Sequence, residues 1–194
     1  MSQGKLIFTP PLNEPPPTLG PLIERLTDLG FLGTALERGG YRVGERFMQL
    51  VSFMGCSPFL QLEPPQEGSQ RFCQIHFNGP FDRPQIIQGK QRRPPRCPRC
   101  RRPLPDWQTQ LTSGSGLARS CPYCDTPLTL ADLSWGTRAG MGRFFIEVWE
   151  IYPGDAVPVE ALMARLRGDG AAWHYFWQGP EETGSIQPIL NDQG

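Results

Sequence analysis

The sequence lacks the long apolar runs that cross membranes, and it offers little that could carry catalysis. No stretch approaches the roughly 18 uninterrupted apolar residues of a membrane span, and residues 1–5 lack the apolar core and cleavage site of a signal peptide. Histidine occurs only twice in 194 residues. No glycine-rich loop is followed by a helix in the way that phosphate cradles require. We therefore expect a cytoplasmic protein without a membrane span, and a binding protein rather than an enzyme.

The composition is typical of a globular protein rich in loops. Apolar residues make up 38% of the chain, while proline and glycine contribute 22 residues each. The length suits one domain, or a domain that carries an insertion. It is also sufficient for a hydrophobic core.

Hydrophobic periodicity predicts an α+β fold with N-terminal helices and a small mixed sheet. Helices are expected from Thr18, from Gly44 to Met54 and from Pro158, and strands over Arg71–Phe77, Gln85–Gln88, Arg143–Tyr152 and Ala172–Gln178. Arg143–Tyr152 is apolar on both faces, which is typical of a central strand. The predicted organisation is a Pro-rich extended arm over 1–17, a core over 18–89 and 128–178, an inserted module over 90–127 and a polar tail over 179–194.

Two cysteine pairs are the most specific motif. Cys97-Pro98-Arg99-Cys100 is followed, after 20 residues, by Cys121-Pro122-Tyr123-Cys124. This spacing is within the usual range for a zinc site. Four soft thiolates satisfy tetrahedral zinc and leave no open position for catalysis. We expect one structural zinc ion bound by Cys97, Cys100, Cys121 and Cys124, with Trp107–Thr112 and Leu117–Ser120 forming a hairpin in the gap.

Residues 97–124 resemble a zinc ribbon with rubredoxin-type knuckles, and in that family the four cysteines bind the metal. The resemblance is confined to this segment. Such knuckles often place glycine after the second cysteine, where positive φ is easiest. Here Arg101 and Asp125 occupy those positions, so we expect a less regular first knuckle, because arginine adopts positive φ less readily than aspartate. Iron is the alternative metal, because a four-thiolate tetrahedron accepts both.

A basic stretch precedes and overlaps the first cysteine pair. From residue 90 to 102 it has seven basic residues and no acidic ones, on a chain with 19 basic and 19 acidic residues in total. The stretch could contact nucleic acid or an acidic protein surface, or it could offset the charge of about −2 on a zinc tetrathiolate. The candidate partner or nucleic-acid contacts are Arg92, Arg93, Arg96, Arg99, Arg101, Arg102, Trp107 and Tyr123.

Three function classes remain open. The first is a zinc-binding, non-catalytic protein that acts as a protein–protein adaptor, an assembly factor or an accessory subunit of a larger complex. The second is a nucleic-acid-binding zinc-ribbon protein that uses residues 90–102. The third is an enzyme with a site near Cys56, Cys73 and His76, although no motif supports thiolate catalysis there.

Overall fold

A six-stranded antiparallel sheet forms the body of the protein. The computed structural model describes residues 4–54, 60–66, 69, 71–88, 94–105, 107, 119–179 and 187–188. The sheet has the order β12-β1-β10-β5-β3-β2. Its strands are β1 (Lys5–Thr9), β2 (Leu32–Ala35), β3 (Tyr41–Val43), β5 (Gln74–Asn78), β10 (Phe145–Trp149) and β12 (His174–Gln178).

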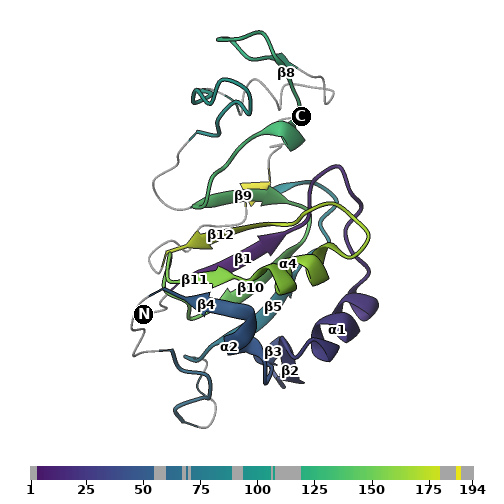
Figure 1. The fold of residues 1–194 in the computed structure, drawn as a ribbon, viewed down its shortest axis with the longest axis vertical. Helices are drawn as coiled ribbons and strands as arrows, with labels where there is room; N and C mark the ends of the chain where they lie inside the picture. Colours follow the sequence, from purple (N-terminus) through teal and green to yellow (C-terminus); the bar gives the residue numbers. More distant parts are fainter. Residues whose placement is uncertain are drawn as a thin grey trace.

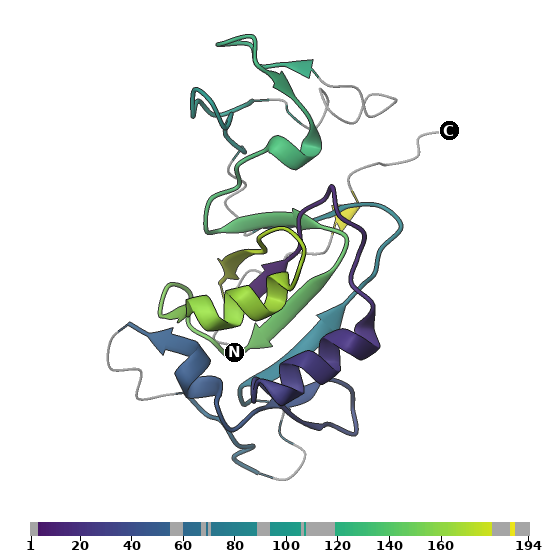
Figure 2. The same cartoon turned by 45° about the vertical axis from the view of Figure 1, so that its right-hand side comes forward.

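Two helices, α1 (Leu19–Asp28) and α4 (Glu160–Arg167), cover one face of this sheet (Figures 1 and 2). Each helix buries two leucines four residues apart, Leu22 and Leu26 in α1 and Leu162 and Leu166 in α4. This spacing places the pair on one side of a helix. Alternate residues of the central strands meet these leucines, so the largest hydrophobic cluster lies between the helices and the sheet.

A smaller sheet packs against the opposite face. It has the order β13-β6-β9 and consists of β6 (Gln85–Gln88), β9 (Ala139–Gly142) and β13 (Gln187–Pro188). Ile87 of β6 packs with Ile7, Phe145 and Phe176 of the large sheet. The close approach requires Gly140, because a side chain there would collide with the Phe176 ring.

The segment between β6 and β9 extends from the body at one end of the long axis (Figure 1) and contains the four cysteines. We call its described part, residues 94–105, 107 and 119–138, the cysteine module. Its elements are β7 (Arg119–Ser120), β8 (Pro127–Leu128) and the 3-10 helix η1 (Leu130–Asp132). Ile86 and Met141, which pair across β6 and β9, pack with Cys97, Leu104 and other apolar residues of the module. One hydrophobic cluster therefore joins the module to the small sheet.

The mixed α+β fold is confirmed, and so is the central position of the strand predicted over Arg143–Tyr152. β10 lies between β1 and β5. β6 has the predicted bounds, and both α1 and α4 lie in segments where helices are predicted. β10 and β12 are parallel to each other, with the antiparallel β1 between them.

Two local interpretations of the sequence are wrong. Residues 5–9 are not a surface arm, because they form β1, whose Leu6, Ile7 and Phe8 are fully buried. The helix expected over Gly44–Met54 is only α2 (Phe47–Leu50), followed by β4 (Val51–Phe53), which pairs with β11 (Ala156–Pro158). The β-branched Val51 suits a strand better than a helix.

The buried position of β1 predicts that its loss destabilises the whole body. Leu6→Ala should lower the free energy of unfolding by about 2–5 kcal/mol, because Leu6 is 0% exposed in the main cluster. Leu19→Ala is the matched control, because Leu19 is 36% exposed, and it should cost about 1 kcal/mol or less. Urea denaturation measures both. If both substitutions change the free energy of unfolding by the same small amount, residues 5–9 form a surface arm and not a buried strand.

Candidate metal centre

The first cysteine pair forms a tight turn held by its own backbone. The N–H of Cys97 donates to the carbonyl of Arg102 at 3.0 Å, and the N–H of Arg101 donates to the carbonyl of Cys97 at 2.9 Å. Arg101 has a φ of 59°. This left-handed residue reverses the chain after Cys100, so that both sulfurs point to the same side.

The second pair repeats this geometry. Cys121 N–H donates to the Thr126 carbonyl at 2.8 Å, Asp125 N–H donates to the Cys121 carbonyl at 2.9 Å, and Asp125 has a φ of 53°. The first knuckle is thus as regular as the second, contrary to the expectation based on arginine at position 101. The Arg96 guanidinium donates to the Arg101 carbonyl at 2.9 Å, which supports the turn in which Arg101 takes up its positive φ.

The four sulfurs have the spacing of a tetrahedral metal site. All four Sγ atoms lie within 4.8 Å of one another, with Cys97 to Cys124 at 3.8 Å and Cys100 to Cys121 at 3.7 Å. A Zn–S bond of about 2.3 Å corresponds to an S···S edge of about 3.8 Å in a regular tetrahedron. These distances are much too long for disulfides. The residues therefore fit one four-thiolate metal ion, and the chemistry of the donor set accepts zinc or iron.

Burial of the site matches a structural metal. Cys97 and Cys121 are 0% exposed, while Cys100 and Cys124 are half-buried. Four protein ligands fill a tetrahedral shell and leave no position for a water molecule or a substrate. The site can stabilise the fold, but it cannot activate a bound water.

Two thiols of the metal-free cluster differ in their tendency to ionise. The Thr126 hydroxyl, 3.2 Å from the Cys124 sulfur, and the Thr126 backbone N–H lower the pKa of Cys124 to about 6. The Arg102 backbone N–H lowers the pKa of Cys100, but burial and the neighbouring cysteine sulfurs outweigh it and raise the value to about 11. The backbone N–H of the second residue after each pair therefore faces a sulfur, as metal knuckles require.

The basic residues that the structure describes surround the knuckles. Arg96, Arg99, Arg101 and Arg102 are exposed. Arg99 reaches the hydroxyl of Thr126 at 3.4 Å, and the Arg102 guanidinium lies 5.1 Å from the centre of the Tyr123 ring. Both contacts run from the first knuckle to the second. Arg92 and Arg93, the other two predicted contacts, lie outside the described residues.

The two aromatic candidates occupy opposite environments. Tyr123 is 44% exposed beside Arg102, whereas Trp107 is 7% exposed. The Trp107 ring packs edge-to-face against Trp135, with 4.8 Å between ring centres. Trp107 therefore belongs to the hydrophobic cluster of the module, where its ring is not open to a partner. The hairpin predicted in the gap falls largely outside the described residues, although β7 pairs with β8.

The structure gives the thiolate alternative little support. Cys73 is buried, and burial together with Glu150 raises the pKa of its thiol far above the physiological range. Cys56 lies outside the described residues. His76 borders a cavity of about 570 Å³ on the sheet face away from the helices. Its ring stacks on Trp149 at 4.1 Å, and burial lowers its pKa more than the nearby Glu147 raises it.

Sequence reasoning missed a polar network beside His76. Burial raises the pKa of Glu147, but the Lys5 ammonium, at 2.7 Å, and two further donors outweigh this and leave the pKa below its ordinary value. Those donors are the indole N–H of Trp149 at 2.9 Å and the amide of Asn78 at 3.2 Å. The network links β1, β5 and β10 on the face of the large sheet opposite the helices. Only the alternation of β10, with Glu147 between two apolar residues, hinted at it.

Comparison with protein-family models, with curated proteins and with solved structures gives no match for this chain.

The cysteine geometry predicts about one metal ion per chain, and zinc in aerobically purified protein. Cys97→Ser and Cys121→Ser should each lose most of the bound zinc, because each removes one of four ligands. Cys73→Ala is the control, since Cys73 is buried in the main core, and it should stay fully loaded. Elemental analysis against protein concentration measures this. Full zinc content in both serine variants would exclude the site.

The hydrogen bonds to Cys124 predict its selective reactivity after zinc removal. Because the Thr126 hydroxyl and backbone N–H lower the pKa of Cys124 to about 6, we expect it to react as a thiolate at neutral pH, and its reaction with iodoacetamide should slow as the pH falls below 6. Thr126→Val should slow labelling several-fold at pH 7, because the hydroxyl that stabilises the thiolate is lost.

Thr137→Val, at an exposed threonine outside the knuckles, should leave the labelling rate unchanged. Mass spectrometry of short labelling reactions identifies the modified cysteine. Equal labelling of all four knuckle cysteines would show that this arrangement does not persist without metal.

Proposed function

We propose that the protein is a non-catalytic zinc-ribbon adaptor, an assembly factor or accessory subunit that uses its cysteine module to contact a protein partner. The observation that carries this proposal is the closed four-thiolate cluster with exposed arginines around it. A zinc ion with four protein ligands holds a surface rigid but has no open position for catalysis and no redox chemistry. A surface held in this way loses little conformational entropy when it binds.

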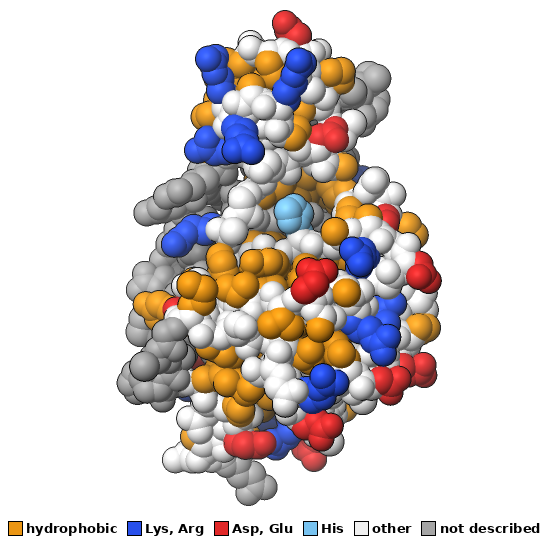
Figure 3. Space-filling model, in the orientation of Figure 1, with side chains coloured by type: hydrophobic (Ala, Val, Ile, Leu, Met, Phe, Trp, Pro, Cys, Tyr) orange, Lys and Arg blue, Asp and Glu red, His pale blue; other side chains and the backbone are white. Residues whose placement is uncertain are grey.

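The charges of the module support a contact with an acidic partner. Within the part of the chain that the structure describes, none of the four knuckle arginines, Arg96, Arg99, Arg101 and Arg102, forms a salt bridge with a carboxylate. Figure 3 shows several basic side chains and fewer acidic ones on the module, above the mixed charges of the body, and the described basic residues of the module are all arginines. A zinc tetrathiolate of charge about −2 offsets only part of four positive charges.

Nucleic acid is the second candidate partner. Tyr123 is exposed beside Arg102, and an aromatic ring next to a guanidinium is a platform on which bases stack. The burial of Trp107 removes the other ring that could have served in this way. We therefore place the protein partner first. No helix in the described part of the chain is long and apolar enough to cross a membrane.

The proposal predicts that a stoichiometric protein partner survives nuclease treatment. Zinc-loaded protein is used to capture its partner from a native extract, with and without nuclease. Replacing Arg101 and Arg102 together with glutamine should weaken capture by about tenfold, because exposed interface charges are lost. The matched control replaces Arg165 and Arg167, which are exposed at the end of α4, and should not change capture.

The salt dependence of binding separates the two candidates. A nucleic-acid partner disappears after nuclease, and its affinity falls steeply with salt because counterions are released. Gel shifts with single- and double-stranded oligonucleotides across a salt series measure this. Nuclease-sensitive capture together with a shift that the Arg101 and Arg102 replacements abolish would overturn the protein-partner proposal.

A further inference from the structure

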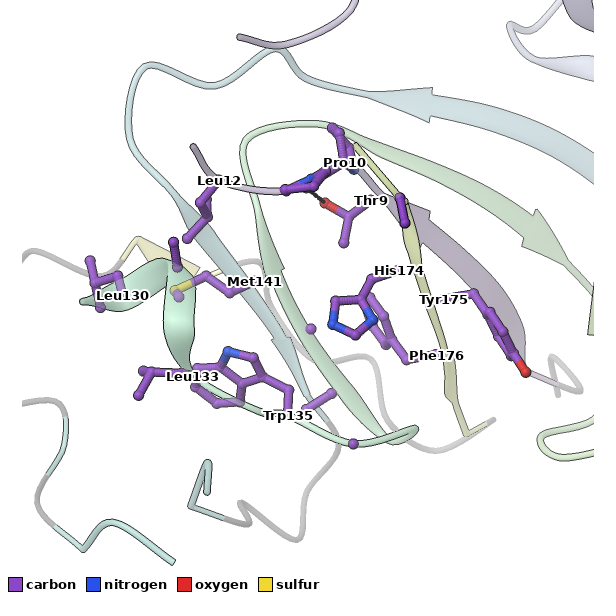
Figure 4. A pocket seen from close by; sticks show the side chains of 16 residues that line it. Thr9, Pro10, Leu12, Leu130, Leu133, Trp135, Met141, His174, Tyr175 and Phe176 are labelled. Carbon is purple, nitrogen blue, oxygen red and sulfur yellow. Dashed lines mark hydrogen bonds between the residues drawn. The ribbon is translucent and has the colours of Figure 1, made fainter. Parts of the chain in front are cut away.

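An apolar pocket lies where the cysteine module meets the body. Its volume is about 220 Å³. We call it the waist pocket. Three segments that are distant in the sequence form its walls: the end of β1 with the prolines that follow, the module from η1 to β9, and β12. Figure 4 shows Leu12, Leu130 and Met141 on one side, with His174 and Trp135 bordering the remaining space.

The lining of the pocket is mainly apolar, and its polar side-chain groups belong to Thr9, Trp135, His174 and Tyr175. None of the residues that line this pocket carries a carboxylate, an ammonium or a guanidinium. The Thr9 hydroxyl is used within the chain, where it donates to the Pro10 carbonyl at 3.3 Å. Gly140 brings β9 against Phe176 at the base of the pocket, and the rings of Pro10 and Pro11 form a stiff wall. The pocket therefore exists without rearrangement of the chain.

The size of the pocket points to one side chain rather than a small molecule. Drug-sized ligands and cofactors occupy about 300–1,000 Å³, which is more than this pocket offers. A single leucine or phenylalanine from another protein is the usual occupant of such a space, because buried apolar anchors dominate protein interfaces. A nucleobase suits it less well, because the prolines, leucines and Met141 that make up much of the lining offer no side-chain hydrogen-bond partner to the polar edges of a base.

The pocket is connected to the first knuckle. Arg96 and Ser134 exchange backbone hydrogen bonds at 2.8 and 3.1 Å, and Ser134 stands between Leu133 and Trp135 of the pocket wall. Leu133 belongs to the same buried cluster as Cys97 and Cys121. The metal site thus holds one wall of the pocket in place.

Two arginines and one aspartate flank the module wall of the pocket, and Glu14 lies by the opposite wall, where it accepts from the Ala171 N–H at 2.6 Å. Arg96 leads into the knuckle, and Arg138 precedes β9; both are exposed. The nearby Asp132 carboxylate accepts from the N–H and the hydroxyl of Thr129, both at 2.7 Å, and keeps its negative charge, so the two arginines outnumber it on the module wall. An apolar anchor that enters here from an acidic segment would meet arginines on the module side.

We propose that the waist pocket accepts one apolar side chain, leucine or phenylalanine, from an acidic peptide segment of a partner protein. The proposal rests on the adaptor function above and names the kind of partner. The anchor supplies affinity by burial, and the arginines of the module select for the acidic residues that flank it.

Selection from a random peptide library on the zinc-loaded full chain tests this. We expect enriched peptides with one large apolar residue flanked by aspartate or glutamate. Synthetic copies of these peptides, measured by fluorescence anisotropy, should lose about tenfold or more in affinity when the anchor becomes alanine. Their affinity should also fall as salt rises. Basic or purely apolar consensus sequences, or no enrichment, would overturn the proposal.

Two variants that fill the pocket locate the binding site. Ala131→Trp and Ala172→Trp start from exposed alanines on opposite walls, so they should fill the space without disturbing the core and reduce peptide affinity about tenfold or more. Ala131→Ser is the conservative control and should bind normally. Zinc content confirms that each variant is folded at the knuckles. Undiminished binding in both tryptophan variants would contradict the assignment.

Other outcomes separate this proposal from the one on which it rests. If partner capture from extract needs Arg101 and Arg102 but tolerates Ala131→Trp, the adaptor function stands and the pocket proposal fails. If neither zinc nor partner is found, the adaptor function itself fails. An oligonucleotide displaced by Ala131→Trp, or a dimer of this chain that the same substitution dissociates, would assign the pocket to another occupant and overturn the peptide proposal.

Discussion

The fold of the cysteine module depends on the close approach of its four sulfurs, which lie 3.8 Å apart between Cys97 and Cys124 and 3.7 Å apart between Cys100 and Cys121. They bring together two turns that are separated by 20 residues in the sequence. Without a metal, four half-buried or buried thiols offer little attraction for one another. With zinc, the binding free energy of about 10–16 kcal/mol seen for structural zinc sites becomes folding energy for the segment. The cluster around Cys97 and Cys121 also contains the apolar side chains of Ile86, Leu104, Trp107, Leu128, Leu133 and Met141, so this contribution would add to that of apolar burial.

β6 transmits the constraint to the body. Ile86 packs into the cluster of the cysteine module, and its neighbour Ile87 packs against the large sheet. Adjacent residues of a strand point to opposite faces, so two consecutive isoleucines serve two different cores. Met141 and Gly140 of β9 divide in the same way, since Met141 faces the module and Gly140 meets Phe176. The module therefore projects from the body but rests on a shared layer, and the waist pocket opens beside that layer.

Local sequence patterns predicted the features that depend on residues close together in the chain, namely the cysteine turns and several helices and strands. The cysteine spacing predicted the thiol cluster because a CxxC turn is formed by adjacent residues. The resemblance to rubredoxin-type knuckles indicated that Arg101 and Asp125 occupy positions where positive φ is common, and both residues have a positive φ. Hydrophobic periodicity found α1, β6 and β10, whose burial repeats with the period of their structure.

Contacts between segments that are distant in the chain could not be predicted from local sequence patterns. The prolines that follow β1 made residues 5–9 look like part of an extended arm. Their burial, with Leu6, Ile7 and Phe8 fully buried, follows from the pairing of β1 with β10 and β12, which the sequence does not show. The sequence suggested that Trp107 is an exposed stacking residue, but in the structure it is buried against Trp135. The network of Glu147 and Lys5 joins residues 142 positions apart. The waist pocket likewise requires three separate segments to meet.

Hydrogen exchange of the zinc-loaded protein, before and after chelation, tests most directly the claim that the metal site supports the cluster shared by the module and the small sheet. The account predicts that chelation speeds exchange in β7 and β8 and also at the pairing of Ile86 with Met141 between β6 and β9. β1 and β10, which lie in the main core, should keep their protection. If β6 and β9 exchange as slowly without zinc as with it, the module is an independent attachment and the account is contradicted.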